Sequence, residues 1–241
     1  MRSLPKFLLA VALTLVGSQA AHADFIVLYN TGVLSANNND GTNASVLAGG
    51  VLDPHYTVQL PGGGPFLSTF AAANQAAYFR PAGGSAQYIN PSGNAEVNDP
   101  AGNYVYQTTF DLSGLIASTA TISGRIYVDN SIVDILVNGQ STGFSGGGFS
   151  VGQQLDFLIP AGFVGFQDGV NTLSFLLNNA GPGANPEAIY VTSLVGTADA
   201  VAVPEPGTVA LLGLMGVGLL VTHVRRRRQR AHLASDDTLP S

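Results

Sequence analysis

The chain lacks cysteine and tryptophan altogether, and between Asp24 and Ala202 it also lacks lysine. The absence of cysteine excludes disulfides and thiolate metal sites. A zinc site of another kind would need several histidines, but His55 is the only histidine in that stretch. A region of this length can still bury a core as a single domain, so it does not need covalent cross-links.

Positive charge is scarce in the same stretch. Arg80 and Arg125 are its only cations, against twelve aspartates and glutamates. An acidic surface of this kind repels phosphate backbones and acidic polysaccharides, so we expect no nucleic-acid partner. Cations, a neutral extracellular polysaccharide and other proteins stay open as partners.

The remaining basic residues are concentrated towards the two ends of the chain. Arg2 and Lys6 precede the apolar run FLLAVALTLVG, and Ala21-His22-Ala23 follows as a small-x-small cleavage pattern. This order predicts a signal peptide over residues 1–23 and an exported domain over residues 24–202. A retained N-terminal anchor is the alternative, but the apolar run is short for a membrane span.

A second apolar stretch lies near the C-terminus. Thr208 to Val224 carries no formal charge, and about 17 helical residues are roughly 26 Å long, near the lower limit for crossing the hydrocarbon. Arg225, Arg226, Arg227 and Arg228 follow, and such a cluster stays on the cytoplasmic side. The pattern predicts a transmembrane helix over 208–224 and a cytoplasmic tail over 231–241.

The motif Val203-Pro204-Glu205-Pro206, called the box from here on, precedes this span by one residue. The two prolines interrupt regular structure and leave an extended, accessible peptide. The order of box, Gly/Leu-rich span and arginines in VPEPGTVALLGLMGVGLLVTHVRRRRQR resembles the PEP-CTERM sorting signal of bacterial exported proteins. The resemblance implies a signal over 203–230 that an exosortase-type membrane sorting enzyme reads and removes. An ordinary single-pass anchor is the alternative, but it explains the span and the arginines without explaining the box.

Period-two alternation of apolar and polar residues dominates the exported domain after Tyr104. Tyr104, Tyr106, Thr108 and Phe110 share one face of a half-buried strand, and Asn138-Gly139 is a strong hairpin signal. Phe66 to Arg80 has helix-like spacing and predicts either a single helix or a packed loop. Roughly six to nine short strands with Gly-rich turns indicate an all-β, antiparallel β-sandwich.

The segments YVYQTTFDLSG, ATISGRIYVDNSIVDILVNGQSTG and GFVGFQDGVNTLSFLLNNAGPGANPEAIYV resemble the galactose-binding-like jelly-roll domains of bacterial surface proteins. The openings LYNTGV and DPHYTV resemble the start of the same domain in PEP-CTERM proteins. The resemblance implies a jelly roll. It does not by itself assign a function, because this fold carries binding, accessory and purely structural roles.

Candidate chemistry in the exported domain is sparse. Ser68, His55 and Asp53 are the residue types of a nucleophile, a base and an orienting acid, but no Gly-x-Ser-x-Gly elbow accompanies them, so we expect no enzyme activity. Asp129, Asp134 and Asn138 place oxygen donors along one hairpin, where they suit either calcium or ordinary turns; the turn interpretation is favoured.

A glycan site needs exposed aromatic faces beside hydrogen-bonding groups. Tyr78 and Tyr88, together with Asn178 and Asn179, form the best candidate set, although core packing is the more common use of such residues. We therefore expect an exported, non-catalytic surface or extracellular-matrix protein, held at the inner membrane as a precursor and then released to the cell surface. A lectin-like carbohydrate-binding module is the alternative, and a hydrolase is the weaker third.

Overall fold

The computed structural model describes residues 22–202, 213–216 and 218–227. The chain divides into two compact units, one comprising Ala21–Val201 and the other comprising Met1–Ala20 with Ala202–Ser241. In the second unit, residues 213–216 and 218–227 are helical. No helix within the described stretches has the length and apolar character needed to cross a membrane. Most of the predicted signal peptide, residues 208–212 and 217 of the predicted span, and the tail over 231–241 lie outside the described residues.

The unit Ala21–Val201 is built from β-strands that pair antiparallel throughout. The strands are β1 (Ala23–Phe25), β2 (Leu52–Gln59), β3 (Leu67–Ala71), β4 (Ile89–Asn90), β5 (Gly102–Asp111), β6 (Thr121–Asp129), β7 (Ser131–Val137), β8 (Gln140–Ser141), β9 (Leu155–Ile159), β10 (Val170–Asn179) and β11 (Ala188–Asp199), with one 3-10 turn, η1 (Ala117–Thr119). The all-β, antiparallel prediction is therefore confirmed, and the strands are more numerous than expected.

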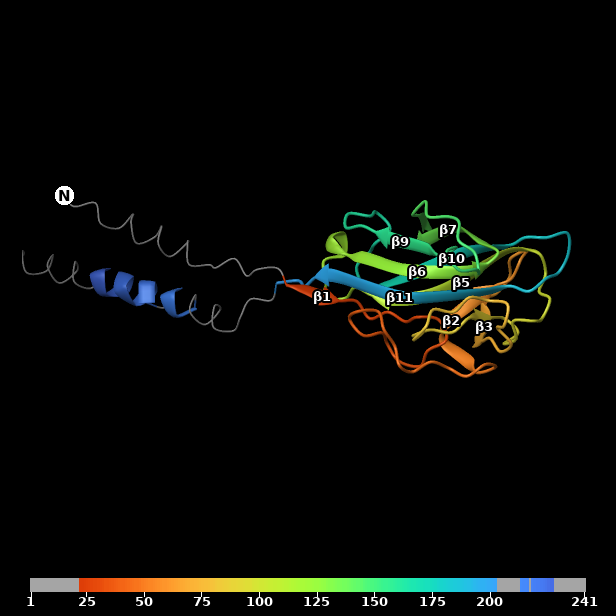
Figure 1. Ribbon diagram of the computed structural model, residues 1–241. Helices are drawn as coiled ribbons and strands as arrows, with labels where there is room; N and C mark the ends of the chain where they lie inside the picture. The colour runs from red at the N-terminus through yellow and green to blue at the C-terminus, as the bar shows by residue number, and fades with distance from the viewer. Residues whose placement is uncertain (1–21, 203–212, 217, 228–241) are drawn as a thin grey trace, which may run out of the picture. The chain divides into compact units, whose positions relative to one another are not determined.

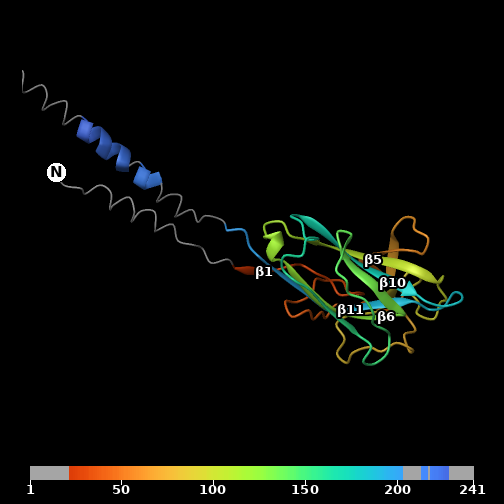
Figure 2. The same ribbon diagram turned by 90° about the horizontal axis from the view of Figure 1, so that it is seen from above.

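All of these strands belong to one sheet with the order β8-β7-β10-β5-β2-β3-β4-β11-β6-β9, and β1 pairs with β11. Figures 1 and 2 both show β6 beside β11 and β5 beside β10. The sheet curls until its two ends face each other. Phe157 of β9 and Phe175 of β10 pack edge to face with ring centroids 6.2 Å apart, although these strands lie near opposite ends of the order. The result is a sandwich-like fold made from one curled sheet.

The main core lies between the facing halves of this sheet. Tyr104, Tyr106, Thr108 and Phe110 of β5 are all buried, as the alternation predicts. Gly124 of β6 leaves room for the Phe157 ring of the neighbouring strand β9, because a Cβ atom at Gly124 would lie 3.0 Å from that ring. The inward-facing residues of β6, β9, β10 and β11 complete the same cluster.

The predicted hairpin is confirmed. β7 and β8 pair with Val137 opposite Gln140, and Asn138 and Gly139 adopt φ values of 50° and 79°. Positive φ at both central residues is the geometry of a type I′ turn, which matches the right-handed twist of the flanking strands.

A second, smaller core covers the other face of β6 and β11. Tyr127 and Tyr190 point away from the main core and pack with Tyr78 and Tyr88, which come from the long connection between β3 and β5. Phe149 adds an edge-to-face contact with Tyr78 at 5.6 Å. This connection therefore acts as a cover that buries one face of the sheet.

The helix considered for Phe66 to Arg80 does not form. Leu67–Ala71 is strand β3, which pairs with β2 and β4, and the residues after it belong to the covering connection. Pairing on both edges of β3 satisfies its backbone, and this outweighs the helical spacing of Phe66, Phe70, Ala73 and Ala77. The packed-loop alternative holds only for the residues after Ala71.

Candidate functional site

The β-rich unit Ala21–Val201 and the C-terminal segment that begins at Ala202 follow one another directly in the sequence. The amide of Ala200 donates to the carbonyl oxygen of His22 at 3.0 Å, and the amide of Val201 donates to that of Gly114 at 2.9 Å. Hydrogen bonds of the β-rich unit therefore hold the backbone as far as Val201. The box Val203-Pro204-Glu205-Pro206 and Arg228 lie outside the described residues.

The helical residues 218–227 carry three of the four candidate arginines. Arg225, Arg226 and Arg227 are exposed, and so are the apolar side chains before them. These are Leu219, Leu220, Val221 and Val224, with exposed fractions between 43% and 68%. The described part of the segment thus presents apolar side chains followed immediately by positive charge.

Asp53 and His55, two of the three candidate triad residues, take other partners than each other's side chains. Asp53 is 2% exposed, and its two carboxylate oxygens accept hydrogen bonds from the amides of His55 at 2.8 Å and Gly32 at 2.7 Å. The His55 ring stacks on Tyr29 with centroids 3.6 Å apart, and its Nε2 lies 3.1 Å from the carbonyl oxygen of Leu34. Asp53 thus contacts the backbone of His55, not its ring, and the pair fastens the loop 30–34 to β2.

The three candidate calcium ligands take separate partners. Asp129 accepts a hydrogen bond from the Tyr78 hydroxyl at 3.1 Å, and Asp134 accepts one from the amide of Gly143 at 3.2 Å. The side-chain oxygen of Asn138 accepts from the amide of Thr172 at 2.9 Å, which ties the hairpin to β10. These bonds favour the turn interpretation. Within the described ranges, no group of three or more His, Cys, Asp and Glu residues could hold a metal ion.

The predicted aromatic site is part of the second core. Tyr78 is 8% exposed and Tyr88 is fully buried, so neither ring offers an exposed face to a sugar. The Tyr88 hydroxyl donates to the carbonyl oxygen of Phe79 at 2.9 Å. Asn178 donates to the side chain of Asn103 at 2.8 Å, and Asn179 is 1% exposed. The structure uses these four residues for packing and internal hydrogen bonds.

Two pockets, each with a volume of about 380 Å³, both include Arg80 and Gln87 in their linings. Arg80 is exposed, and its guanidinium donates a long hydrogen bond of 3.4 Å to Gln87. The first pocket reaches Asn74 and Gln75, and the second reaches Gly84 and Tyr190. Both present amide and guanidinium groups to solvent.

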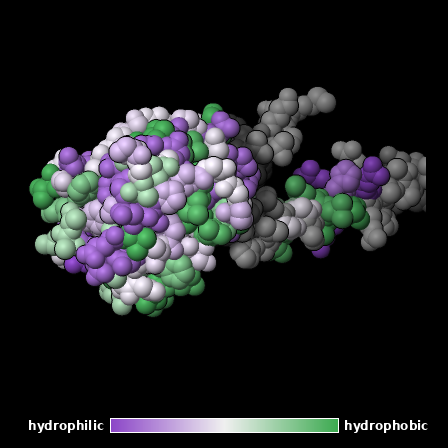
Figure 3. All heavy atoms as spheres, turned by 90° about the vertical axis from the view of Figure 1, so that its right-hand side faces the viewer, coloured by the Kyte–Doolittle hydropathy of each residue, from purple (hydrophilic) through white to green (hydrophobic). Residues whose placement is uncertain are grey.

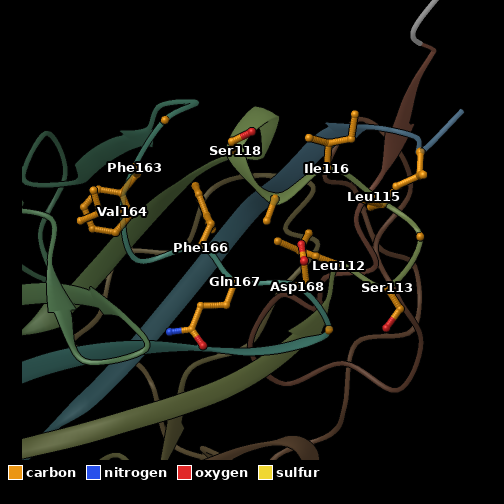
Figure 4. Close-up of a pocket in the computed structure, with 15 residues that line it drawn as sticks. Leu112, Ser113, Leu115, Ile116, Ser118, Phe163, Val164, Phe166, Gln167 and Asp168 are labelled. Atoms are coloured by element: carbon orange, nitrogen blue, oxygen red, sulfur yellow. The ribbon is translucent and has the colours of Figure 1, made fainter.

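A larger pocket of about 930 Å³ opens between residues 112–118 and 162–169. Its lining includes Phe163, Phe166 and Leu112 together with Gln167 and Asp168, and Figure 4 shows Asp168 beside Leu112. Asp168 is the one ionisable side chain in this lining, and no histidine accompanies it. General acid and base chemistry would need at least one further titratable partner here.

In the end-on view of Figure 3, hydrophilic and hydrophobic residues alternate over the surface of the domain without merging into one apolar patch.

A buried acidic cluster at one end of β5, β10 and β11 is the feature that the sequence-based reasoning missed. Glu187 is fully buried, and its Oε1 accepts a hydrogen bond of 2.5 Å from the Tyr106 hydroxyl. Burial raises the pKa of the Glu187 carboxyl well above its usual value, and the nearby Asp99 raises it further. Burial likewise raises the pKa of Asp99 to about 6. Glu187 shares the inward parity of Ile189 and Val191, so the period-two pattern of β11 could have placed it inside.

The comparisons with known proteins concern the C-terminal segment. The family model of the PEP-CTERM protein-sorting motif matches residues 202–228. No curated protein matches the chain, and no solved structure does. The match supports an exosortase substrate: PEP-CTERM signals are recognised by this membrane enzyme, and they imply export, a membrane-anchored precursor and processing for the cell surface.

Proposed function

We propose that the chain is an exported, non-catalytic surface or extracellular-matrix protein whose β-rich domain is released from its membrane precursor by an exosortase. One observation carries this proposal: the matched motif begins at residue 202, directly after the last residue of the β-rich unit. The sorting signal and the folded domain therefore share no residues. Removal of the signal leaves every hydrogen bond of the domain in place.

Each part of the signal has a separate physical role in this proposal. Thr208 to Val224 holds the precursor in the membrane, and Arg225, Arg226, Arg227 and Arg228 keep its end on the cytoplasmic side. Pro204-Glu205-Pro206 provides the extended peptide that the enzyme recognises. At the other end, cleavage of the signal peptide before Asp24 leaves Asp24 and Phe25 paired with Ala198 and Thr197 of β11.

The non-catalytic role is supported by the use of the few chemically capable side chains. Asp53 and His55 fasten a loop, and Ser68 is an exposed residue of β3 opposite Thr57. The candidate base and its orienting acid are thus occupied in structural contacts. The domain itself is the delivered product.

The test replaces Pro204, Glu205 and Pro206 by alanine in a bacterial host that carries an exosortase. The wild-type chain should lose the segment after the box and leave the inner membrane, whereas the variant should stay full-length and membrane-bound. The readouts are intact mass and membrane fractionation. The matched control replaces Pro61 and Pro65, which lie outside the motif in the turn PGGGP, and should be processed like the wild type. If the wild type and the box variant both stayed full-length in the inner membrane, the segment would be an ordinary membrane anchor and not a sorting signal.

A carbohydrate-binding module is the second candidate, favoured by the two polar pockets beside Arg80 and Gln87. Planar amide and guanidinium groups can donate to the hydroxyl groups of a neutral polysaccharide. A glycan array with the processed protein checks this candidate, with Arg80→Ala as the variant and Arg125→Ala as the control. Saturable binding that the Arg80 variant loses would support the module, and binding equal in both variants would place the ligand elsewhere.

A further inference from the structure

Three buried side-chain oxygens at one end of the domain have no hydrogen-bond donor. They are Oδ2 of Asp99, Oδ1 of Asn179 and Oε2 of Glu187. Their residues are 8%, 1% and 0% exposed, respectively. Leaving a polar atom buried without a partner costs about 1–3 kcal/mol, and more for a charged group. Three such oxygens in one region indicate that a partner of positive character belongs there.

The three side chains come from different segments that the backbone brings together. Asp99 precedes β5 and pairs with Asn185 through two backbone hydrogen bonds of 2.9 and 3.1 Å. Asn179 ends β10, and its amide nitrogen donates to the carbonyl oxygens of Asp99 at 3.3 Å and Asn185 at 3.2 Å. Glu187 follows Asn185 by two residues, immediately before β11. The side-chain nitrogen of Asn179 donates these bonds, which fixes the orientation of the side chain. Its side-chain oxygen Oδ1 is the atom left without a donor.

No cation of the domain neutralises these carboxylates. Arg125 is bound to Asp156 at 2.6 Å, and Arg80 donates to Gln87. These are the two cations between Asp24 and Ala202. Tyr106 supplies one neutral donor to Glu187, which leaves the second oxygen of that carboxylate unpaired. A buried carboxylate without an opposite charge is strongly unfavourable.

We propose that Asp99, Asn179 and Glu187 form a binding site for a calcium ion. Carboxylate and amide carbonyl oxygens are the ligands that calcium takes, and its flexible coordination accepts backbone carbonyl oxygens and water for the remaining positions. Magnesium demands a more regular octahedral arrangement and loses its water reluctantly, so it fits this buried set less well. The site uses two carboxylates and one amide, and it shares no residue with the hairpin set Asp129, Asp134 and Asn138.

The test measures calcium binding to the purified full chain in non-ionic detergent. Equilibrium dialysis with radioactive calcium gives the stoichiometry, and tyrosine near-ultraviolet circular dichroism gives the melting temperature. We expect a high-affinity calcium ion at this site and a melting temperature that rises with calcium concentration, because an ion that binds the native state stabilises it. Magnesium at the same concentration should give a smaller rise.

Two glutamate variants make the test specific. Glu187→Gln keeps the size of the side chain and should weaken calcium binding at least tenfold, while Glu96→Gln changes an exposed glutamate and should bind like the wild type. Asp99→Asn is the second variant, and it decides the question if Glu187→Gln does not fold. The site would be overturned if dialysis detected no bound calcium and the melting curves in calcium and in chelator were identical. Protons would then neutralise the carboxyls. Wild-type affinity in the folded Glu187 or Asp99 variant would overturn it as well.

Discussion

The Tyr106 hydroxyl donates a hydrogen bond of 2.5 Å to the Glu187 carboxyl group, and both residues are fully buried. Tyr106 lies in β5 and Glu187 immediately precedes β11, two strands that are not neighbours in the sheet order. The bond therefore crosses the interior of the curled sheet. Burial raises the pKa of both groups well above their usual values, so Tyr106 stays a neutral donor throughout the physiological range.

Replacing Tyr106 by phenylalanine should destabilise the domain by about 1–3 kcal/mol, because it removes the donor of a buried carboxyl group while keeping the ring. Tyr104→Phe is the matched control. Its hydroxyl donates to the carbonyl oxygen of Pro100 at 2.8 Å, and because that neutral oxygen also accepts a hydrogen bond from the Asn179 side chain, the loss should be smaller. Urea unfolding followed by circular dichroism measures both, and an equal loss in the two variants would contradict the special role of Glu187.

In chelator, the free energy of unfolding should fall as the pH rises from about 4 to 6. The folded pKa of Asp99 is about 6 and that of Glu187 is also raised, so the folded state binds protons more tightly than the unfolded chain does. The stabilisation is complete below the unfolded values near pH 4 and is lost as the pH passes the folded values. The other ionisable neighbours of this cluster are Asp129 and the hydroxyls of Tyr78, Tyr104 and Tyr106.

Two exposed carboxyls make the free energy of unfolding rise with pH instead of fall, but they do so in a lower pH range. Hydrogen bonds from Thr42 and Ser113 lower the pKa of Asp40 and Asp111, so their contribution is lost only below about pH 4. Urea midpoints between pH 4.5 and about 7.5 therefore isolate the buried groups. Asp99→Asn should flatten the slope, and a stability that rises with pH over this range would refute the assignment.

Asn138→Ala should cost about 1–3 kcal/mol. The side chain of Asn138 donates to Gly165 at 2.9 Å and Asn171 at 2.7 Å, and it accepts from the amide of Thr172. Alanine loses these bonds and tolerates the positive φ poorly. Gln140→Ala, at an exposed position of the same hairpin, is the control and should change stability by less than about 0.5 kcal/mol.

The fragment Asp24 to Ala202 should fold without either end of the chain, because its core and its sheet are complete within the unit Ala21–Val201. Far-ultraviolet circular dichroism should show a β spectrum, and heating should give one cooperative transition. A helical spectrum or a gradual loss of signal would show that the domain depends on the segments outside it.

The local pattern determined most of the strand structure. Alternation identified β5, β6, β9, β10 and β11, because a strand with one buried face must place apolar residues at every second position. Asn138-Gly139 identified its hairpin, because few residue pairs adopt two successive positive φ values without strain. The order of the box, the uncharged stretch and the arginines resembles the PEP-CTERM sorting signal, and the family match over residues 202–228 agrees.

Only the tertiary structure decided which polar and aromatic residues are accessible. Tyr78 and Tyr88 are buried because the connection between β3 and β5 folds over the outer face of β6 and β11, a contact that no short-range pattern specifies. The segments that carry Asp99 and Glu187 come together because the backbones of Asp99 and Asn185 pair and the Asn179 side chain bonds to both. Exposure and proximity depend on how the sheet curls, whereas periodicity reports only which face of a strand is apolar.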